Sequence, residues 1–356
     1  WLVSPYSAKT RSYLRFINAD VQDVVPTAWV LNGRIQKAVG RLIMPTVEFD
    51  DGSWLQDSSV IVDHFAARPG VTSIEPPGNT QRFASALLEV FADEWLPMMA
   101  LHYRWNLLDN AEFAKREFAK AGFPWLPVFA ARPLINPLAS RMQSYLSVLG
   151  VDSETREGVE EMTRSIIHAL DVQLQQSVYV LGDRPCLGDF ALYGPLWAHL
   201  YRDPGSRHLF DDAPRVNAWM TRFTEGASVE GEFLANDEVP EALDPLFECV
   251  LTDQWSWIRT LVEAIDSYCD AHPEATRVPR ALGRAPFTIR GCHGERKLIT
   301  FVQWKAQRAR RAFERDRARN VDWMTRVIGR ESAQRCIPEM AHPMVLKDHK
   351  AVLASP

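Results

Sequence analysis

Four residues near the start of the chain, Ser4-Pro5-Tyr6-Ser7, have types and a spacing that could do chemistry. They follow a short apolar segment, 1–3, that is typical of a strand, and they precede apolar residues at helical spacing. A hydroxyl at a helix start lies beside free backbone N–H groups and the positive end of the helix dipole, which favour an anion. Two hydroxyls cannot form a disulfide, so dithiol exchange at this turn is excluded. Ser4 can still donate a hydrogen bond to a thiolate that another molecule supplies.

Five further motifs follow this turn in a fixed order. They are Met44-Pro45-Thr46-Val47, Asp51-Gly52-Ser53-Trp54-Leu55, Gln56-Asp57-Ser58-Ser59-Val60-Ile61, 181–190 and 214–219. The set resembles the pattern of the glutathione transferases. The first motif is similar to that family's "Val-Pro-x-Leu" strand, and the third is similar to its "Glu/Gln-Ser-x-Ala-Ile" helix start. The chain beyond 235 has no counterpart in an ordinary member.

The resemblance and the local sequence patterns together predict three regions and a fold class of α/β plus all-α. Residues 1–76 would form a thioredoxin-like, glutathione-binding domain with the order β-α-β-α-β-β-α. Residues 77–235 would form the helical domain of a glutathione transferase, and 236–356 a mixed, mainly helical extension with a short β-hairpin. The chain begins inside the first expected strand, so we expect that residues before Trp1 are missing.

The local patterns predict where the elements lie. We expect strands at 1–3, 21–25, 44–49 and 53–55, helices at 6–18, 29–39 and 58–67, a proline-rich loop at 123–137 and a linker at 227–237. The last two of these strands would form a hairpin through Asp50-Asp51-Gly52.

The resemblance also assigns roles to individual residues. Ser4 would be catalytic, because one hydrogen bond to a charged acceptor is worth ~1.5–3 kcal/mol, or about one to two units of the thiol pKa. Pro45 would follow a cis peptide bond, so that the backbone of Met44 pairs with the cysteinyl part of glutathione. Ser58 would bind the γ-glutamyl carboxylate. Asp57 would meet the α-amino group, although Asp is one carbon shorter than the family's Glu.

Each serine also has a simpler interpretation. Ser4 and Ser58 could be plain N-caps of the helices that they begin. Three basic residues are equal candidates for the glycyl carboxylate: Arg34, Lys37 and Arg41. The sequence does not choose between these alternatives.

The second substrate would meet the helix expected from residue 81 to residue 108, which in the family lines both a hydrophobic cleft and the dimer interface. Candidate cleft residues are Tyr6, Ser7, Trp95, Met99, His102 and Trp105. Those on the helix share one stripe, and His102 could be a general base. The same stripe could equally be core. Asp93, Glu94, Tyr103 and Arg104 could equally form an internal ion-pair network.

Composition restricts the partners. The chain has 356 residues and a net charge of −5, which gives no reason to expect that it binds nucleic acid. No segment approaches the roughly 20 apolar residues of a membrane span. The five cysteines are odd in number and widely spaced, which fits a reducing compartment and predicts no disulfide framework and no metal site. We therefore expect a cytoplasmic protein.

The region after 235 contains Trp255, Trp257, Trp304 and Trp323, which predict that it packs on the rest of the protein. Its segment 305–319 is rich in Lys and Arg. Interleaved Ala residues and Phe313 favour a surface helix over a nucleic-acid-binding arm.

Together these features predict a glutathione transferase-like enzyme that activates the thiol of glutathione, its co-substrate, for attack on a small hydrophobic electrophile. The resemblance further implies a homodimer. Two alternatives share the fold: a non-catalytic binding or interaction protein, and a glutathione-dependent isomerase or ether-cleaving lyase.

Overall fold

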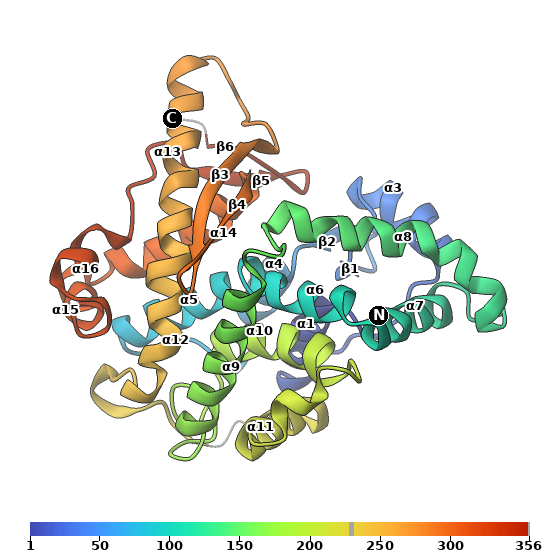
Figure 1. Cartoon of the computed structure of the whole chain (residues 1–356), viewed down its shortest axis with the longest axis horizontal. Coiled ribbons are helices and arrows are strands. Elements are labelled where there is room, and N and C mark those ends of the chain that lie inside the picture. The colour runs from blue at the N-terminus through green and yellow to red at the C-terminus, as the bar shows by residue number, and fades with distance from the viewer. Residues whose placement is uncertain (228–230, 355–356) are drawn as a thin grey trace. The chain divides into compact units, whose positions relative to one another are not determined.

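The computed structural model describes residues 1–227 and 231–354 (Figure 1). The chain forms two compact units, each built from three separate segments. Unit 1 comprises Trp1–Ile74, Ala100–Leu146 and Phe190–Glu230, and unit 2 comprises Glu75–Met99, Ser147–Asp189 and Gly231–Pro356. Part of the expected linker, 228–230, lies outside the described residues. The division into three domains at 76 and 235 stays a prediction.

The first segment of unit 1 contains both strands of this unit's small sheet. Its elements are α1 (Pro5–Phe16), α2 (Ala28–Val30), the π-helix η1 (Leu31–Ile35), α3 (Gln36–Val39), β1 (Thr46–Glu48), β2 (Trp54–Gln56) and α4 (Ser58–Ala66). β1 and β2 are antiparallel, with Val47 opposite Leu55. Gly52 takes a φ of 82° in the turn, where an Asp51 carboxylate oxygen accepts from Ser53 N at 2.8 Å. The predicted hairpin and the helix after it are confirmed.

The strands predicted at 1–3 and 21–25 are wrong. The carbonyl of Trp1 accepts a hydrogen bond from Ser4 N at 3.1 Å, which closes a turn where the first strand was expected. In the stretch 21–25, Val24 is 60% exposed and Val25 is 50% exposed. A strand in a sheet needs a partner and a buried face, and this apolar run has neither among the described residues.

The other segments of unit 1 are helical. They contribute to α6 (Pro97–Asn106), α7 (Leu108–Gly122), α8 (Val128–Leu149), α10 (Leu187–Pro195), the π-helix η2 (Leu196–Tyr201), the 3₁₀-helix η3 (Arg207–Phe210) and α11 (Pro214–Glu225). The loop predicted at 123–137 is wrong beyond Pro127, since α8 runs through Pro133 and Pro137. A proline frees the carbonyl four residues earlier, which for Pro133 is that of Phe129. Phe129 is exposed, so water can satisfy that carbonyl.

Unit 2 combines two central segments of the chain with the whole C-terminal region. Its helices are α5 (Asn79–Glu94), α9 (Arg156–Gln173), η4 (Ala235–Asp237), η5 (Glu241–Leu243), α12 (Asp244–Cys249), η6 (Val250–Gln254), α13 (Trp255–Ala271), α14 (Phe301–Glu314), α15 (Arg317–Ile328) and α16 (Arg330–Cys336). Its strands form two hairpins: β3 (Ala281–Ile289) with β4 (Cys292–Ile299), and β5 (Met344–Lys347) with β6 (Lys350–Leu353).

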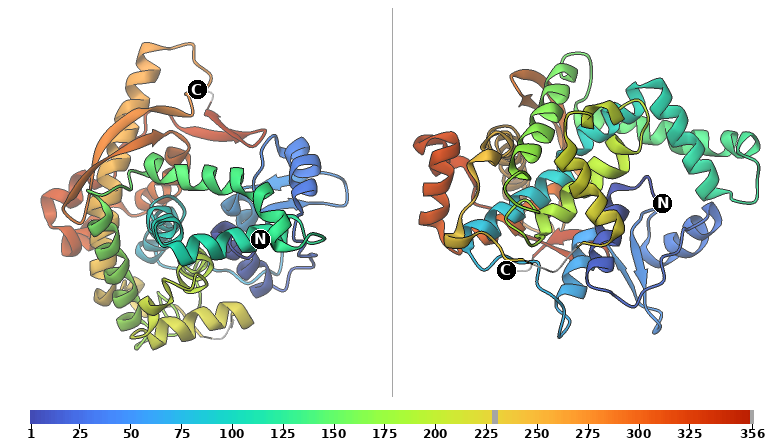
Figure 2. Two further views of the ribbon diagram at one scale, coloured as in Figure 1. Left: turned by 45° about the vertical axis from the view of Figure 1, so that its right-hand side comes forward. Right: turned by 90° about the horizontal axis from the view of Figure 1, so that it is seen from below.

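The first of these hairpins is longer than predicted. Only Arg290 and Gly291 connect β3 to β4, and both have positive φ, as a tight two-residue hairpin requires. Figures 1 and 2 show β3 running beside α13. The hairpin and α13 thus form one packed part of unit 2.

The centre of unit 2 is α5, of which most residues are buried. Lys305 of α14 lies with its Nζ 3.1 Å from Asp93 Oδ2, and Arg308 Nε lies 2.7 Å from Glu89 Oε2. Trp323 of α15 packs edge-on against Phe83 of α5. The prediction that the region packs on the body is confirmed. The prediction of a surface helix at 305–319 is wrong for Lys305, which is 2% exposed and faces a buried carboxylate.

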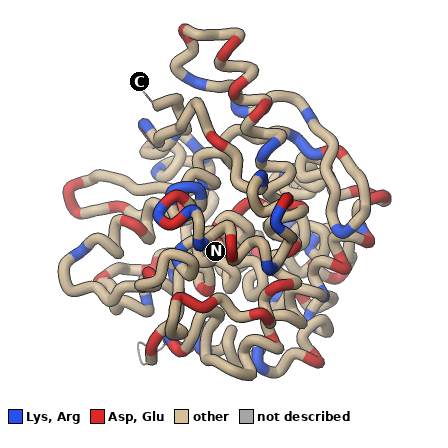
Figure 3. The backbone as a smooth tube through the Cα atoms, turned by 90° about the vertical axis from the view of Figure 1, so that its left-hand side faces the viewer, with Lys and Arg blue, Asp and Glu red and all other residues tan. Residues whose placement is uncertain are grey.

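Charges elsewhere are mixed in sign. Figure 3 shows basic and acidic residues interspersed along the backbone. Within the described residues, no helix is both long and apolar enough to cross a membrane.

Candidate functional site

Ser4 is the N-cap of α1. Its Oγ accepts a hydrogen bond from the amide of Ser7 at 3.3 Å, and Pro5 occupies the first helical position, where a missing N–H costs nothing. The capping interpretation of Ser4 is therefore confirmed. An accepting hydroxyl keeps its own hydrogen, so Ser4 can cap α1 and still donate to a ligand. The side chain is half-buried at the helix start.

The two other residues of this turn differ in exposure. Ser7 is buried and uses its amide to bond Ser4, as a first-turn residue of a helix does. Tyr6 is half-buried. Both lie next to Ser4 in the chain, and their contact with a second substrate stays a prediction.

Met44 and Pro45 are joined by a cis peptide bond, as predicted. Pro45 directly precedes β1, and among the described residues the backbone N–H and C=O of Met44 have no hydrogen-bond partner. The sulfur of Met44 lies 3.5 Å from the nitrogen of Trp1, whose carbonyl bonds Ser4. Met44 is therefore close to the Ser4 turn and has a free donor and a free acceptor.

The start of α4 differs from the prediction by one residue. Asp57 is the N-cap: it has a φ of 84°, and its Oδ1 accepts from the amide of Ser59 at 2.8 Å. The alternative that Ser58 is a plain N-cap is thus wrong. Ser58 is 2% exposed, and its hydroxyl has no hydrogen-bond partner in the described part of the chain. A buried hydroxyl without a partner costs roughly 1–3 kcal/mol.

Lys9 links α1 to the start of α4 and was missed in the sequence. Its side chain is completely buried, and its Nζ lies 3.4 Å from Ser59 Oγ. The signal was present, because Lys9, Tyr13 and Phe16 share one face of α1, so that a charged residue lies on an otherwise apolar stripe. Such a residue must have polar partners in the folded protein.

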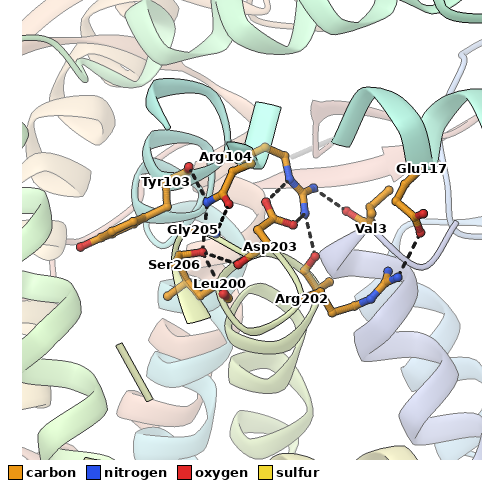
Figure 4. A network of polar contacts seen from close by, with 11 residues as sticks. Val3, Tyr103, Arg104, Glu117, Leu200, Arg202, Asp203, Gly205 and Ser206 are labelled. Carbon is orange, nitrogen blue, oxygen red and sulfur yellow. Dashed lines mark hydrogen bonds and ion pairs between the residues drawn. The ribbon is translucent and has the colours of Figure 1, made fainter. Parts of the chain in front are cut away.

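Arg104 belongs to a buried network of polar contacts in unit 1 (Figure 4). Its guanidinium bonds both carboxylate oxygens of Asp203 at 2.7 Å, and it donates to the carbonyls of Ala198 at 2.7 Å and Val3 at 2.9 Å. Burial raises the pKa of the Asp203 carboxyl, although Arg104 acts in the opposite direction. Arg104 and Asp93 each form a buried ion pair, but with Asp203 and Lys305, which lie outside the set Asp93, Glu94, Tyr103 and Arg104 for which a network was considered.

The predicted cleft residues on α5 and α6 are buried. Trp95 and Met99, in unit 2, are completely inaccessible, and Trp95 packs against the rings of Trp257 and Phe287. His102 and Trp105, in unit 1, are 2% and 6% exposed. A core stripe accounts for this burial. As walls of a cleft these residues stay a prediction.

The basic candidates for the glycyl carboxylate lie on 34–41. Arg34 is exposed and forms an ion pair with Glu48 of β1 at 2.7 Å.

The five cysteines are free. Over residues 1–227 and 231–354, no three His, Cys, Asp or Glu side chains are grouped as metal ligands.

Two family models match the chain. The N-terminal domain model of glutathione S-transferases matches residues 1–77, and the C-terminal domain model matches residues 134–226. No curated protein matches the sequence. The predicted fold class is confirmed: a thioredoxin-like domain, a helical domain of the glutathione S-transferase type and a C-terminal extension.

Solved structures similar to this chain include Gtt2 of Saccharomyces cerevisiae, with 15% identity over 64% of this chain and 95% of that protein, at a TM-score of 0.38. The β-etherase LigF of Sphingobium sp. strain SYK-6 has 16% identity over 68% and 94% of the two chains, at a TM-score of 0.40. A glutathione S-transferase of Xanthobacter autotrophicus Py2 has 17% identity over 67% and 96%, at a TM-score of 0.36.

Proposed function

We propose that this chain, which belongs to the glutathione S-transferase superfamily, binds glutathione and activates its thiol for attack on a small hydrophobic electrophile. The observation that carries the proposal is the hydroxyl of Ser58, which is buried at the start of α4 and has no hydrogen-bond partner among the described residues. A carboxylate of the ligand would supply that partner. The positive end of the α4 dipole would favour the same carboxylate.

The remaining contacts of glutathione follow from the same helix start and from β1. The γ-glutamyl carboxylate would take the Ser58 hydroxyl and amide, and the α-amino group would meet the Asp57 carboxylate. The free N–H and C=O of Met44 would pair with the cysteinyl part, like one rung of an antiparallel sheet. Each hydrogen-bond donor of the ligand would thus meet an acceptor of the protein, and each acceptor a donor.

Ser4 would act on the thiol. A free thiol has a pKa of about 8.5, so at pH 7 only a few per cent is ionised. One hydroxyl donor, with the dipole of α1 behind it, would lower that pKa by about one to two units. The capping bond from Ser7 supports this role, because it fixes the oxygen of Ser4 and leaves the hydrogen to be directed at the sulfur.

The proposal includes a cytoplasmic homodimer. The free cysteines suit a reducing compartment, and family membership favours a dimer. Within unit 2, however, α14 covers α5, the helix expected at the dimer interface. The dimer contact would therefore use another surface. Sedimentation of the full chain measures this directly.

Calorimetry tests the function. We expect the full chain to bind glutathione and S-methylglutathione at or below millimolar concentration, and bound glutathione to show thiolate absorbance in the ultraviolet. Ser58→Ala should weaken the binding of both ligands. Ser267→Ala, an exposed hydroxyl on α13, is the matched control and should weaken neither. Absence of binding would overturn the proposal, and binding without a thiolate signal would favour the non-catalytic binding protein.

A further inference from the structure

The carbonyl group that directly precedes Ser4 is held by a buried charge. Arg104 Nη1 donates to the carbonyl oxygen of Val3 at 2.9 Å, and both residues are less than 5% exposed. The next residue, Ser4, is the N-cap of α1. A displacement of the Val3 carbonyl would therefore move the Ser4 side chain as well.

The guanidinium itself has little freedom. The Asp203 carboxylate bonds the edge formed by Nε and Nη2, and Nη2 also donates to the carbonyl of Ala198. The hydroxyl of Ser206 donates to the backbone carbonyl of Asp203. The same hydroxyl accepts a hydrogen bond from Asn110 Nδ2 (Figure 4). The hydrogen bond to Val3 thus comes from a donor fixed by a buried network.

Gly194 confines the same turn through its lack of a side chain. A Cβ on Gly194 would lie 2.6 Å from the carbonyl oxygen of Pro5, closer than real Cβ atoms approach an oxygen. The backbone of α10 therefore touches the first residue of α1. The chain from Val3 to Pro5 is anchored at one end by Arg104 and pressed against backbone at the other.

From these contacts we infer that Arg104 is a positioning residue, which sets the location of the Ser4 hydroxyl by fixing the Val3 carbonyl. The inference rests on the proposed function, since it concerns the hydroxyl that would meet the thiol of glutathione. Arg104 acts through the backbone rather than on the ligand. A hydrogen bond to a thiolate needs placement within about 0.5 Å, so a loosened turn would weaken activation and leave the carboxylate contacts at α4 intact.

The test uses a double variant, Arg104→Met with Asp203→Leu. A single change at Arg104 would leave the Asp203 charge buried and unpaired, whereas replacing both partners by apolar residues is often neutral for stability. The double variant Lys305→Met with Asp93→Leu removes a comparably buried pair from unit 2 and is the matched control. Arg104→Lys is the second variant. It keeps the charge beside Asp203 but lacks the fork that reaches Val3.

Four quantities are measured on each full-length variant. We expect the thiolate fraction of bound glutathione at pH 7 and kcat to fall about three- to eightfold in both Arg104 variants, the effect of a one-unit rise in a thiol pKa of about 6.5–7.5. The affinity for S-methylglutathione should stay within about twofold, since α4 is unchanged. The amide of Ser7 should exchange its hydrogen faster, because its acceptor on Ser4 is less well placed. The control variant should change none of these quantities.

Unchanged thiolate fraction and kcat in a folded Arg104 variant would overturn the inference, and so would a parallel loss of S-methylglutathione binding. A wild-type protein that binds no glutathione would instead overturn the proposed function. In that case faster exchange at Ser7 in the variants would still support Arg104 as the residue that fixes the turn, and unchanged exchange would overturn it.

Discussion

The start of α4 in unit 1 and the contact between α5 and α14 in unit 2 both bury polar side chains. At the contact between α5 and α14 the buried charges are paired: Lys305 faces Asp93, and Arg308 faces Glu89. At α4 the hydroxyl of Ser58 is buried with no partner in the described chain. Paired charges can be accounted for by the fold alone, whereas an unpaired buried donor lowers stability and calls for another explanation.

We infer from this difference that one region stabilises the fold and the other binds the ligand. Changes at the contact between α5 and α14 should affect the stability of unit 2 and leave ligand binding unchanged. Changes at the starts of α1 and α4 should affect ligand binding or thiol activation, and should cost less stability than the loss of one partner of a buried ion pair. The predictions below test this separation, from the largest expected effect to the smallest.

The largest effect is expected for Lys305→Met. The substitution leaves the Asp93 carboxylate buried without its ion-pair partner, which should lower the free energy of unfolding by about 3–5 kcal/mol. Adding Asp93→Leu should recover most of the loss, because the buried charge is then removed as well. Urea denaturation of the two variants measures the difference.

Two results would break the comparison at this point. One is a single variant as stable as wild type, which would mean that the pair contributes nothing to the fold. The other is a stable single variant that no longer binds glutathione, which would place the contact between α5 and α14 in the functional machinery.

In contrast to Lys305→Met, Ser58→Ala should weaken ligand binding without lowering stability. Loss of a donor to a charged carboxylate should weaken glutathione binding by ~1.5–3 kcal/mol, or roughly 10- to 150-fold in Kd. Stability should stay the same or rise, since the substitution removes an unpaired buried hydroxyl. Calorimetry and urea denaturation on the same preparation give both values. Lower stability with unchanged affinity would show that Ser58 is a structural residue.

The hairpin and the start of α4 were predictable because they depend on local chemistry. Asp51 and Gly52 favour a tight turn, and polar residues followed by an apolar run favour a helix start. The one-residue error at Ser58 has a physical cause. Asp57 takes a left-handed φ and becomes the cap, and the sequence alone does not reveal a backbone angle that few non-glycine residues adopt.

The remaining errors concern contacts between distant residues. Segments 1–3 and 21–25 are apolar enough for strands, but whether a partner strand lies beside them depends on the rest of the fold. A helical stripe containing Trp95 predicts a buried face without showing whether that face is core or cleft. Arg104 pairs with Asp203, 99 positions away in the sequence, and no local pattern relates the two.

The smallest effect, and the most specific, is expected at Ser4. Ser4→Ala removes the donor, so the thiol pKa of bound glutathione should rise by about one to two units and turnover at pH 7 should fall accordingly. The variant also loses the N-cap of α1, which costs ~0.5–2 kcal/mol of stability. This stability loss is the control, because it should appear whether or not Ser4 is catalytic.

Ser4→Cys separates the two roles of this position. It places a thiol at a helix start, where its pKa is lowered. The new thiolate would attack a glutathione mixed disulfide, release the other thiol and leave glutathione bound to the protein, and a second glutathione would then release glutathione disulfide. We expect this variant to gain reduction of mixed disulfides and to lose conjugation to an aryl halide. If Ser4→Ala lowers stability but changes neither the thiolate absorbance nor the rate, Ser4 is only a cap. The activating group would then be Tyr6 or Ser7, the next residues to substitute.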